Sequence, residues 1–278
     1  MAQIEGVIDA DEVVIGTGAV IEEDVFIGSR TGKARRVVIG DHAFIGRGTR
    51  ILVPEFRLGD YSKLHSGSFL HGEKPLHIGR NCWIGGNCVL DSMGGLTVDD
   101  NVGIGAQSQL WTHIQFGDVI EGCRFNSRRP MHVKRDVWFV GHCIVSPVRV
   151  EERSMAMVGS VVTRDMEANH VYAGVPATDM TDRLGPQFPP RTVDEKATSL
   201  REMIGIWEAL NPEFKGQLIV ATSPADRQAD RTWFDVSTRT YNKRGTGPEV
   251  GFLKAHVPLV KFIPEGEPEF VSPPPSGE

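Results

Sequence analysis

The sequence predicts a mainly β protein: a parallel β-helix followed by a small α+β domain toward the C-terminal end. Three observations support this fold class. Aliphatic residues recur every six positions between Ile15 and Val162, the residue after such an anchor is often glycine, and the pattern becomes helical near Val193. A six-residue period fits no α-helical face. It fits a short strand that ends in a sharp bend.

The six-residue repeat predicts a solenoid in which three short strands make one triangular coil. The large anchors should point into the coil, and small or β-branched residues four positions later should point inward where less room is left. Glycine or asparagine near a corner permits a positive φ. Coil starts at Ile39, Leu58, Ile78 and Val98 lie 19, 20 and 20 residues apart, whereas three hexads alone need about eighteen. We expect the extra residues to bulge near residues 57, 76–77 and 96–97.

The cysteines fit this repeat. Cys82, Cys88 and Cys143 occupy the small inward position, where a free cysteine behaves as a small hydrophobe. They are predicted to be buried and reduced. Cys123 lies in a segment that interrupts the repeat.

That interruption is the most informative feature of the repeat. Residues 101–110 are regular, Trp111-Thr112-His113 follows, and the repeat resumes only at Val133. We expect residues 111–131 to form a loop that leaves the coil, with His113 at its start. The β-helix as a whole is predicted to span residues 1–184.

The C-terminal part of the chain lacks the six-residue repeat. Residues 185–190 are rich in proline and look like a linker, and residues 193–210 have an amphipathic helical pattern that Asn211-Pro212 ends. Residues 217–221, 232–240 and 251–262 are predicted as strands or extended segments. Residues 191–263 are therefore expected to form the α+β domain. Residues 264–278, rich in proline and acidic, are expected to be disordered.

Composition and charge argue against some classes of binding partner. The net charge of −6 argues against a nucleic-acid partner, because such binding needs Lys and Arg to neutralise phosphates. No apolar run approaches the roughly 18 residues of a membrane span, so no membrane partner is expected. Residues 1–11 are acidic and have no basic n-region of a signal peptide. A cytoplasmic location is the default expectation.

Several motifs follow one another between residues 98 and 180. The run 100–104 leads to His113, residues 130–133 (PMHV) and 137–141 (VWFVG) follow the interruption, and residues 159–165 (GSVVTRD) and 173–177 (AGVPA) close the region. In this combination the chain resembles the hexapeptide-repeat family over about residues 8–180. Within that family it resembles the acyl-CoA-dependent acetyltransferases that include the maltose and galactoside O-acetyltransferases.

The resemblance implies a left-handed coil and an acetyltransferase that uses acetyl-CoA as cosubstrate, with no metal. It also implies a homotrimer whose sites lie between subunits. His113 corresponds to the catalytic base, and a histidine can accept a proton near neutral pH. A backbone amide, such as that of Gly141, would stabilise the oxyanion. The resemblance assigns cofactor binding to Trp138, Gly141, Val158, Gly159, Thr163, Arg164, Pro176 and Ala177. The family's usual basic residue after this motif is replaced by Thr178, for which Arg164 or Arg183 could substitute.

The acceptor is expected to be a small molecule, such as a sugar or a nucleotide sugar. Asn87 and Asp91 lie one coil before His113 and could bind acceptor hydroxyls. Arg124 and Arg128 make the loop basic and could bind a phosphorylated acceptor, although a solvated loop is an equal alternative. The sequence does not choose between O- and N-transfer.

Two other functions stay open at this point. A γ-carbonic-anhydrase-like zinc lyase has the same repeat fold but needs three converging histidines, and His65 and His71 lie on different faces of the predicted coil. A non-catalytic β-helix scaffold is the other alternative. A histidine retained at the loop junction argues against it.

Overall fold

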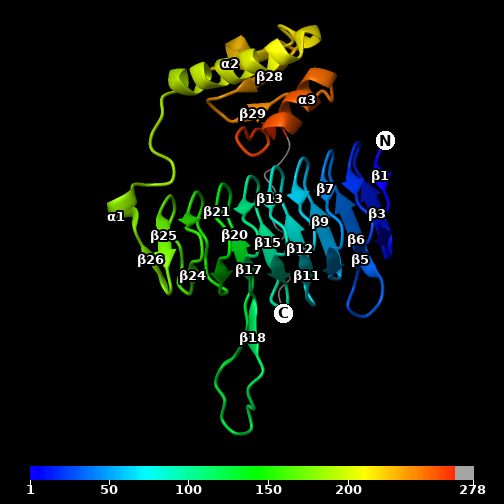
Figure 1. Cartoon of the computed structure of the whole chain (residues 1–278), viewed down its shortest axis with the longest axis vertical. Coiled ribbons are helices and arrows are strands. Elements are labelled where there is room, and N and C mark those ends of the chain that lie inside the picture. Colours follow the sequence, from blue (N-terminus) through cyan, green and yellow to red (C-terminus); the bar gives the residue numbers. More distant parts are fainter. Residues whose placement is uncertain (267–278) are drawn as a thin grey trace. The chain divides into compact units, whose positions relative to one another are not determined.

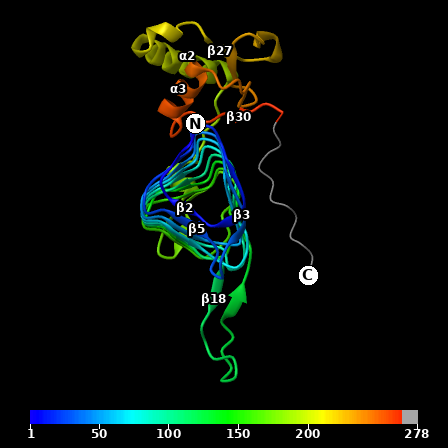
Figure 2. The ribbon, with the colours of Figure 1, turned by 90° about the vertical axis from the view of Figure 1, so that its right-hand side faces the viewer.

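The computed structural model describes residues 1–266 of the chain. Contacts divide these residues into two compact units, residues 1–188 and residues 189–266. The first unit is a β-helix whose three faces are parallel sheets, here called sheets A, B and C. The end-on view in Figure 2 shows the stacked, three-sided coils. The mainly β repeat fold predicted from the sequence is confirmed.

Each face collects one strand from each coil. Sheet A contains, in spatial order, β1 (Gln3–Ile4), β4 (Val20–Ile21), β7 (Phe44–Ile45), β10 (Lys63–Leu64), β13 (Trp83–Ile84), β16 (Gly103–Ile104), β21 (Trp138–Phe139), β23 (Met155–Ala156), β25 (Val171–Gly174) and β26 (Ala177–Asp179). All neighbours in it are parallel except β25 and β26. The short helix α1 (Thr181–Leu184) follows β26.

The other two faces are built in the same way. Sheet B contains β2 (Val7–Ile8), β5 (Phe26–Gly28), β8 (Arg50–Leu52), β11 (Phe69–His71), β14 (Val89–Asp91), β17 (Gln109–Leu110), β22 (Ile144–Val145) and β24 (Val161–Val162). Sheet C contains β3 (Ala10–Ile15), β6 (Ala34–Ile39), β9 (Glu55–Leu58), β12 (Leu76–Ile78), β15 (Leu96–Val98) and β20 (Met131–Val133). The chain runs from a C strand to an A strand, then to a B strand, and back.

The predicted anchors form the core of this unit. From Ile21 to Val162 every anchor is at most 1% exposed, and only Ile15, in the first coil, is partly exposed. Burying one such side chain stabilises the fold by about 1.5–3 kcal/mol. The predicted inward cysteines Cys82, Cys88 and Cys143 are 0% exposed, and none of them forms a disulfide within the described residues. Regular burial along the coils therefore supplies a continuous core.

Glycine and asparagine have separate roles at the corners. Asn81, Asn87 and Asn101, each three residues after an anchor, adopt positive φ values of 55°, 57° and 67°. The glycine directly after an anchor is needed for close stacking instead. A Cβ on Gly85 would lie 2.3 Å from the backbone nitrogen of Ala106 in the next coil.

The extra residues of the longer coils all lie at the corner between sheets B and C, here called the B–C edge. They occupy residues 53–54, 72–75 and 92–95. The positions predicted for these bulges lie a few residues further on, inside β9, β12 and β15, so that prediction is wrong in detail. Residues 29–33 and 111–130 also leave the coil at this edge. Figure 1 shows both longer segments projecting from the same side.

The longest of these segments forms a β-hairpin. Strands β18 (His113–Gln115) and β19 (Asn126–Arg128) pair antiparallel, with His113 opposite Arg128. Its tip exposes several large apolar side chains, including Phe116 and Ile120. The segment expected as a loop therefore leaves the coil, and its base is a pair of antiparallel strands.

The second unit contains two helices and a four-stranded sheet within the described residues. Its helices are α2 (Val193–Leu210) and α3 (Gly247–His256), with 3₁₀ turns η1 (Pro212–Phe214) and η2 (Pro224–Asp226). Its strands, in sheet order, are β27 (Leu218–Ala221), β28 (Thr232–Asp235), β29 (Thr240–Tyr241) and β30 (Ile263–Pro264). Thr192 and Glu195 form a capping box at the start of α2.

Two predictions in this unit are wrong. The segment 251–262, expected to be extended, begins within α3, where Pro248 fits the first turn and Phe252 and Leu253 are buried one turn later. The segment 232–240 is split into two strands, and Arg239 takes a positive φ of 60° between them. In the tail expected to be disordered, Pro264 pairs in β30, and residues 267–278 lie outside the described residues.

Candidate active site

His113 and Asp91 form a hydrogen-bonded pair at the B–C edge. Asp91 ends β14. His113 opens β18, three residues after the end of β17, the strand that pairs with β14. The distance from His113 Nδ1 to Asp91 Oδ2 is 2.8 Å. The backbone and hydroxyl of Thr112 also donate to Oδ2, at 2.7 and 2.6 Å. Stacking of two coils therefore fixes the imidazole.

The Asp91 carboxylate is ionised in this setting. Burial alone would raise its pKa, but the hydrogen bonds from His113 and Thr112 outweigh burial and hold the pKa below its ordinary value. An ionised carboxylate only accepts hydrogen bonds, so Nδ1 of His113 carries the hydrogen. Nε2 of the neutral ring is then free to accept a proton from another molecule.

A second histidine lies on the other side of Asp91. His71 occupies the position in β11 that pairs with Asp91 in β14, and its Nδ1 is 4.0 Å from Asp91 Oδ1. Its ring stacks on Phe69, with centroids 4.6 Å apart. Burial and nearby Arg30 lower the pKa of His71 against the opposite effect of Asp91. His71 is therefore neutral at neutral pH.

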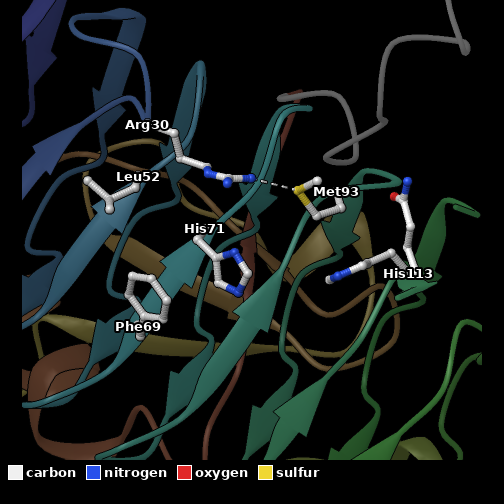
Figure 3. A pocket seen from close by; sticks show the side chains of 7 residues that line it. Arg30, Leu52, Phe69, His71, Met93 and His113 are labelled. Atoms are coloured by element: carbon white, nitrogen blue, oxygen red, sulfur yellow. Dashed lines mark hydrogen bonds between the residues drawn. The ribbon is translucent and has the colours of Figure 1, made fainter. Parts of the chain in front are cut away.

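These residues line a pocket of about 410 Å³, within the range of small-molecule sites. Figure 3 shows its side chains, with His71 lying between Phe69 and His113 in this view. The lining residues come from the ends of sheet B strands and from the segments that leave the coil at the B–C edge. They are Arg30, Leu52, Phe69, His71, Met93, His113 and Gln115.

The base of the hairpin is tied to the coil beside this pocket. Arg128 donates from Nε to Gln115 Oε1 at 2.8 Å and from a terminal nitrogen to Glu73 Oε2 at 2.5 Å. Glu73 Oε1 also lies 3.8 Å from Arg30. One carboxylate thus lies between two guanidinium groups at the pocket rim.

Among the site residues predicted from the sequence, His113 and Asp91 are in direct contact within the described residues. Asp91 is 0% exposed, so it faces His113 and Thr112, away from solvent. Asn87 lies at the corner between sheets A and B and does not line the pocket. Arg128 belongs to the rim, and Arg124 lies further along the hairpin over the ring of Phe125.

The residues expected to bind the cofactor lie on other parts of the coil. Trp138 is 45% exposed on the outer side of sheet A, and Gly141, Val158 and Gly159 lie at the corner between sheets A and B. Thr163 and Arg164 follow β24 at the B–C edge, two strands of sheet B beyond β17. Pro176 and Ala177 belong to the turn and strand after β25. A single chain does not gather these residues around His113.

Sequence reasoning missed Arg30, His71 and Met93 as pocket residues. A usable signal existed for His71, because it stands twenty positions before Asp91 in a repeat whose coils are about that long. Arg30 and Met93 lie in irregular segments, whose positions the repeat does not specify.

The described residues contain neither a candidate metal site nor a candidate membrane-spanning helix. No group of three or more His, Cys, Asp or Glu side chains within residues 1–266 converges in a way that could hold a metal ion. Across the same residues, no helix combines the length and apolar character needed to cross a membrane.

The fold and the pocket define a parallel β-helix protein with a histidine–carboxylate pair at one edge. Residues 75–107 match the family model described as the hexapeptide repeat of succinyl-transferase. These residues therefore carry the hexapeptide repeat, and over part of its length the chain is similar to acetyltransferases.

The chain is similar to curated proteins over part of their length and to several solved structures. A galactoside O-acetyltransferase of Escherichia coli (strain K12) is 31% identical over 105 residues, which are 36% of this chain and 51% of the relative. The chain spans 51 to 60% of the length of the curated relatives it matches. Among solved structures, the polySia-specific acetyltransferase NeuO is 17% identical, with a TM-score of 0.44 over 70% of this chain and 86% of its own. The polysialic acid O-acetyltransferase OatWY is 13% identical, with a TM-score of 0.47 over 69% of this chain and 92% of its own.

Proposed function

We propose that this protein is an acyl-CoA-dependent acetyltransferase that transfers an acetyl group to a hydroxyl or amine of a sugar-like small acceptor. The observation that carries the proposal is the pocket containing His113, whose Nδ1 is held by the buried carboxylate of Asp91 at 2.8 Å. The relationship of the repeat region to acetyltransferases supports the reaction class. A cytoplasmic location, where acetyl-CoA is available, fits this activity.

In the proposed reaction the acceptor attacks the acetyl-CoA thioester directly. His113 Nε2 takes the proton of the acceptor O–H or N–H as its oxygen or nitrogen bonds to the acetyl carbon. The C–S bond then breaks, and the proton passes from His113 to the departing CoA thiolate. General-base help of this kind contributes about 10²–10⁴-fold. Asp91 is a positioning residue that holds the tautomer and orientation of His113.

We further propose that the complete site forms between copies of this chain in a homotrimer. The cofactor residues expected from the sequence lie on sheet A, at its corner with sheet B, and beyond β24, so a second copy would have to bring Trp138 and Gly141 toward His113. The hairpin that begins at His113 exposes Phe116, Ile120 and Phe125 at 102%, 90% and 66%. Apolar side chains exposed to this degree on one segment are typical of a contact surface.

The test is acetyl-CoA turnover against a panel of sugars, comparing the wild type with His113→Ala and His132→Ala. His132 is a matched control, because it also pairs with a carboxylate, Asp99, at 2.7 Å, but lies on sheet C outside the pocket. Only His113→Ala should lose about 10²–10⁴-fold in kcat. Equal activity of the wild type and His113→Ala would remove His113 as the base.

A further inference from the structure

We infer that the acceptor is an acidic sugar, whose anionic group is bound by Arg30 while its hydroxyl or amine faces His113. This inference rests on the proposed acetyltransferase function and specifies the substrate class of the same pocket. It follows from three features of the pocket: the weak partners of Arg30, the charge at the rim, and the shortage of accessible acceptor atoms.

Arg30 has weak partners for a guanidinium group. Its contacts are a hydrogen bond to the thioether sulfur of Met93 at 3.2 Å and an ion pair with Glu73 at 3.8 Å. A thioether is a weak acceptor, and an arginine offers five N–H donors. Its side chain is 47% exposed and lines the pocket (Figure 3). The guanidinium therefore retains donors for a ligand with strong acceptor oxygens.

The rim carries an excess of positive charge. Arg30 and Arg128 share the single carboxylate of Glu73, and Glu73 lies closer to Arg128, at 2.5 Å against 3.8 Å from Arg30. Asp91 does not offset this charge at the pocket surface, because it is fully buried and bonded to His113 and Thr112. A carboxylate or phosphate entering the pocket would compensate Arg30 without displacing Glu73 from Arg128.

The pocket also lacks the groups that usually recognise neutral sugar hydroxyls. Hydroxyl donors need acceptors, yet the Asp91 carboxylate is buried and Gln115 Oε1 already accepts from Arg128 at 2.8 Å. Leu52, Phe69 and Met93 supply apolar surface. Apart from one acceptor nitrogen on each of His71 and His113, the polar groups left to a ligand are donors, which favours a ligand rich in acceptor oxygens. Because one planar guanidinium matches a carboxylate in bidentate fashion, we assign the anionic group as a carboxylate, with phosphate as the alternative source of the same chemistry.

Binding is tested first, independently of turnover. Imidazole signals of His71 and His113 are followed by NMR while the full-length protein is titrated with glucose, glucuronate or glucose 6-phosphate. We expect the anionic sugars to shift these signals at concentrations about 10- to 100-fold lower than glucose, the range for hydrogen bonds to a charged group. Arg30→Gln should abolish the difference, whereas Arg201→Gln, the same charge change on α2, should keep it. Equal or weaker binding of both anions overturns the inference.

Turnover then separates this inference from the proposed function. Wild-type kcat/KM should favour glucuronate over glucose, the preference should shrink with added salt, and Arg30→Lys should retain only part of it. A stronger response to glucose 6-phosphate, still dependent on Arg30, supports the anionic class and identifies phosphate. Efficient transfer to neutral sugars without Arg30 dependence overturns the inference and leaves the acetyltransferase intact. Failure to bind acetyl-CoA by calorimetry overturns the proposed function itself.

Discussion

Asp91 and His113 are 22 residues apart in the chain, yet Oδ2 of one lies 2.8 Å from Nδ1 of the other. The contact exists because β14 and β17 are neighbours in sheet B, so the end of one strand lies beside the residues that follow the next. A carboxylate that is 0% exposed keeps an imidazole in one tautomer.

Replacing Asp91 by Asn should lower kcat by about 10²–10⁴-fold, with little change in KM for acetyl-CoA. An Asn amide that donates to Nδ1 would move the ring hydrogen to Nε2, which could then no longer accept the acceptor proton. Steady-state kinetics measure the split between kcat and KM. Asp118→Asn, in the exposed part of the hairpin, is the control. Unchanged kcat in Asp91→Asn would show that the pair has no positioning role.

His71 should titrate below its ordinary pKa near 6.5. Burial, aided by Arg30, lowers its folded-state pKa. Between that value and about 6.5 the unfolded chain binds more protons, so the contribution of His71 to stability is complete above about pH 6.5 and is lost as the pH falls. NMR titration gives the midpoint directly. Thermal unfolding should show a smaller loss between pH 7 and 5 for His71→Gln than for the wild type.

Mixing two inactive variants should restore activity if the site lies between copies of the chain. His113→Ala lacks the base, and Trp138→Asp disrupts the outer face of sheet A. Trimers that contain both variants would hold some sites with an intact His113 and an intact Trp138. Light scattering should give about three times the chain mass of 30.6 kDa. A monomer, or no recovery after unfolding and refolding the variants together, would contradict the shared site.

Two adjacent glycines should differ in their tolerance of a methyl group. A Cβ on Gly85 would lie 2.3 Å from backbone nitrogen in the next coil, whereas a Cβ on Gly86 has its nearest contact at 3.2 Å, the carbonyl oxygen of Ser66. Gly85→Ala should therefore reduce the free energy of unfolding by about 1–3 kcal/mol, and Gly86→Ala by clearly less. Chemical denaturation followed by circular dichroism compares them, and equal losses would contradict the stacking argument.

Acetyl transfer should survive metal removal. The proposed chemistry uses the His113 imidazole and the thioester, and the described residues offer no cluster able to hold an ion. Dialysis against a strong chelator should leave kcat unchanged, and elemental analysis should find less than stoichiometric zinc. One zinc per chain, with activity lost on its removal, would favour the zinc lyase that the sequence left open.

The coil was predictable because its cause is local and repeated. A six-residue spacing of anchors such as Ile78, Ile84 and Leu90 determines which side chains point inward, and nothing distant has to be known. The departure of residues 111–130 from the coil was predictable from the break after Leu110 for the same reason, but the pairing of β18 and β19 into a hairpin was not. Helix α3 was not predictable from local pattern. Gly251 and the β-branched residues near Val257 favour extended structure, whereas the burial of Phe252 against Trp207 and Phe234 favours a helix.

The candidate site was predictable only at His113. Asp91 was recognised as a neighbour of the site, but the sequence does not reveal that its carboxylate is buried, so it was assigned to the acceptor. Arg30 and Met93 reach the pocket from segments of irregular length, 63 positions apart in the chain. Their meeting depends on how many residues each coil adds at the B–C edge, which no local pattern encodes.

The B–C edge lies between the regular strands of sheet B and the segments of variable length that follow them. Neighbouring strands lie about 4.7–4.9 Å apart, so Leu52, His71 and Asp91 form rungs at a fixed spacing, however long the segment between each rung and the next strand of sheet C. Lengthening one segment changes the loop beside one rung and leaves the rungs, the core and the histidine–carboxylate pair in place. In the proposed enzyme, a new loop at this edge would therefore be enough to fit a different acceptor, with the His113–Asp91 pair unchanged.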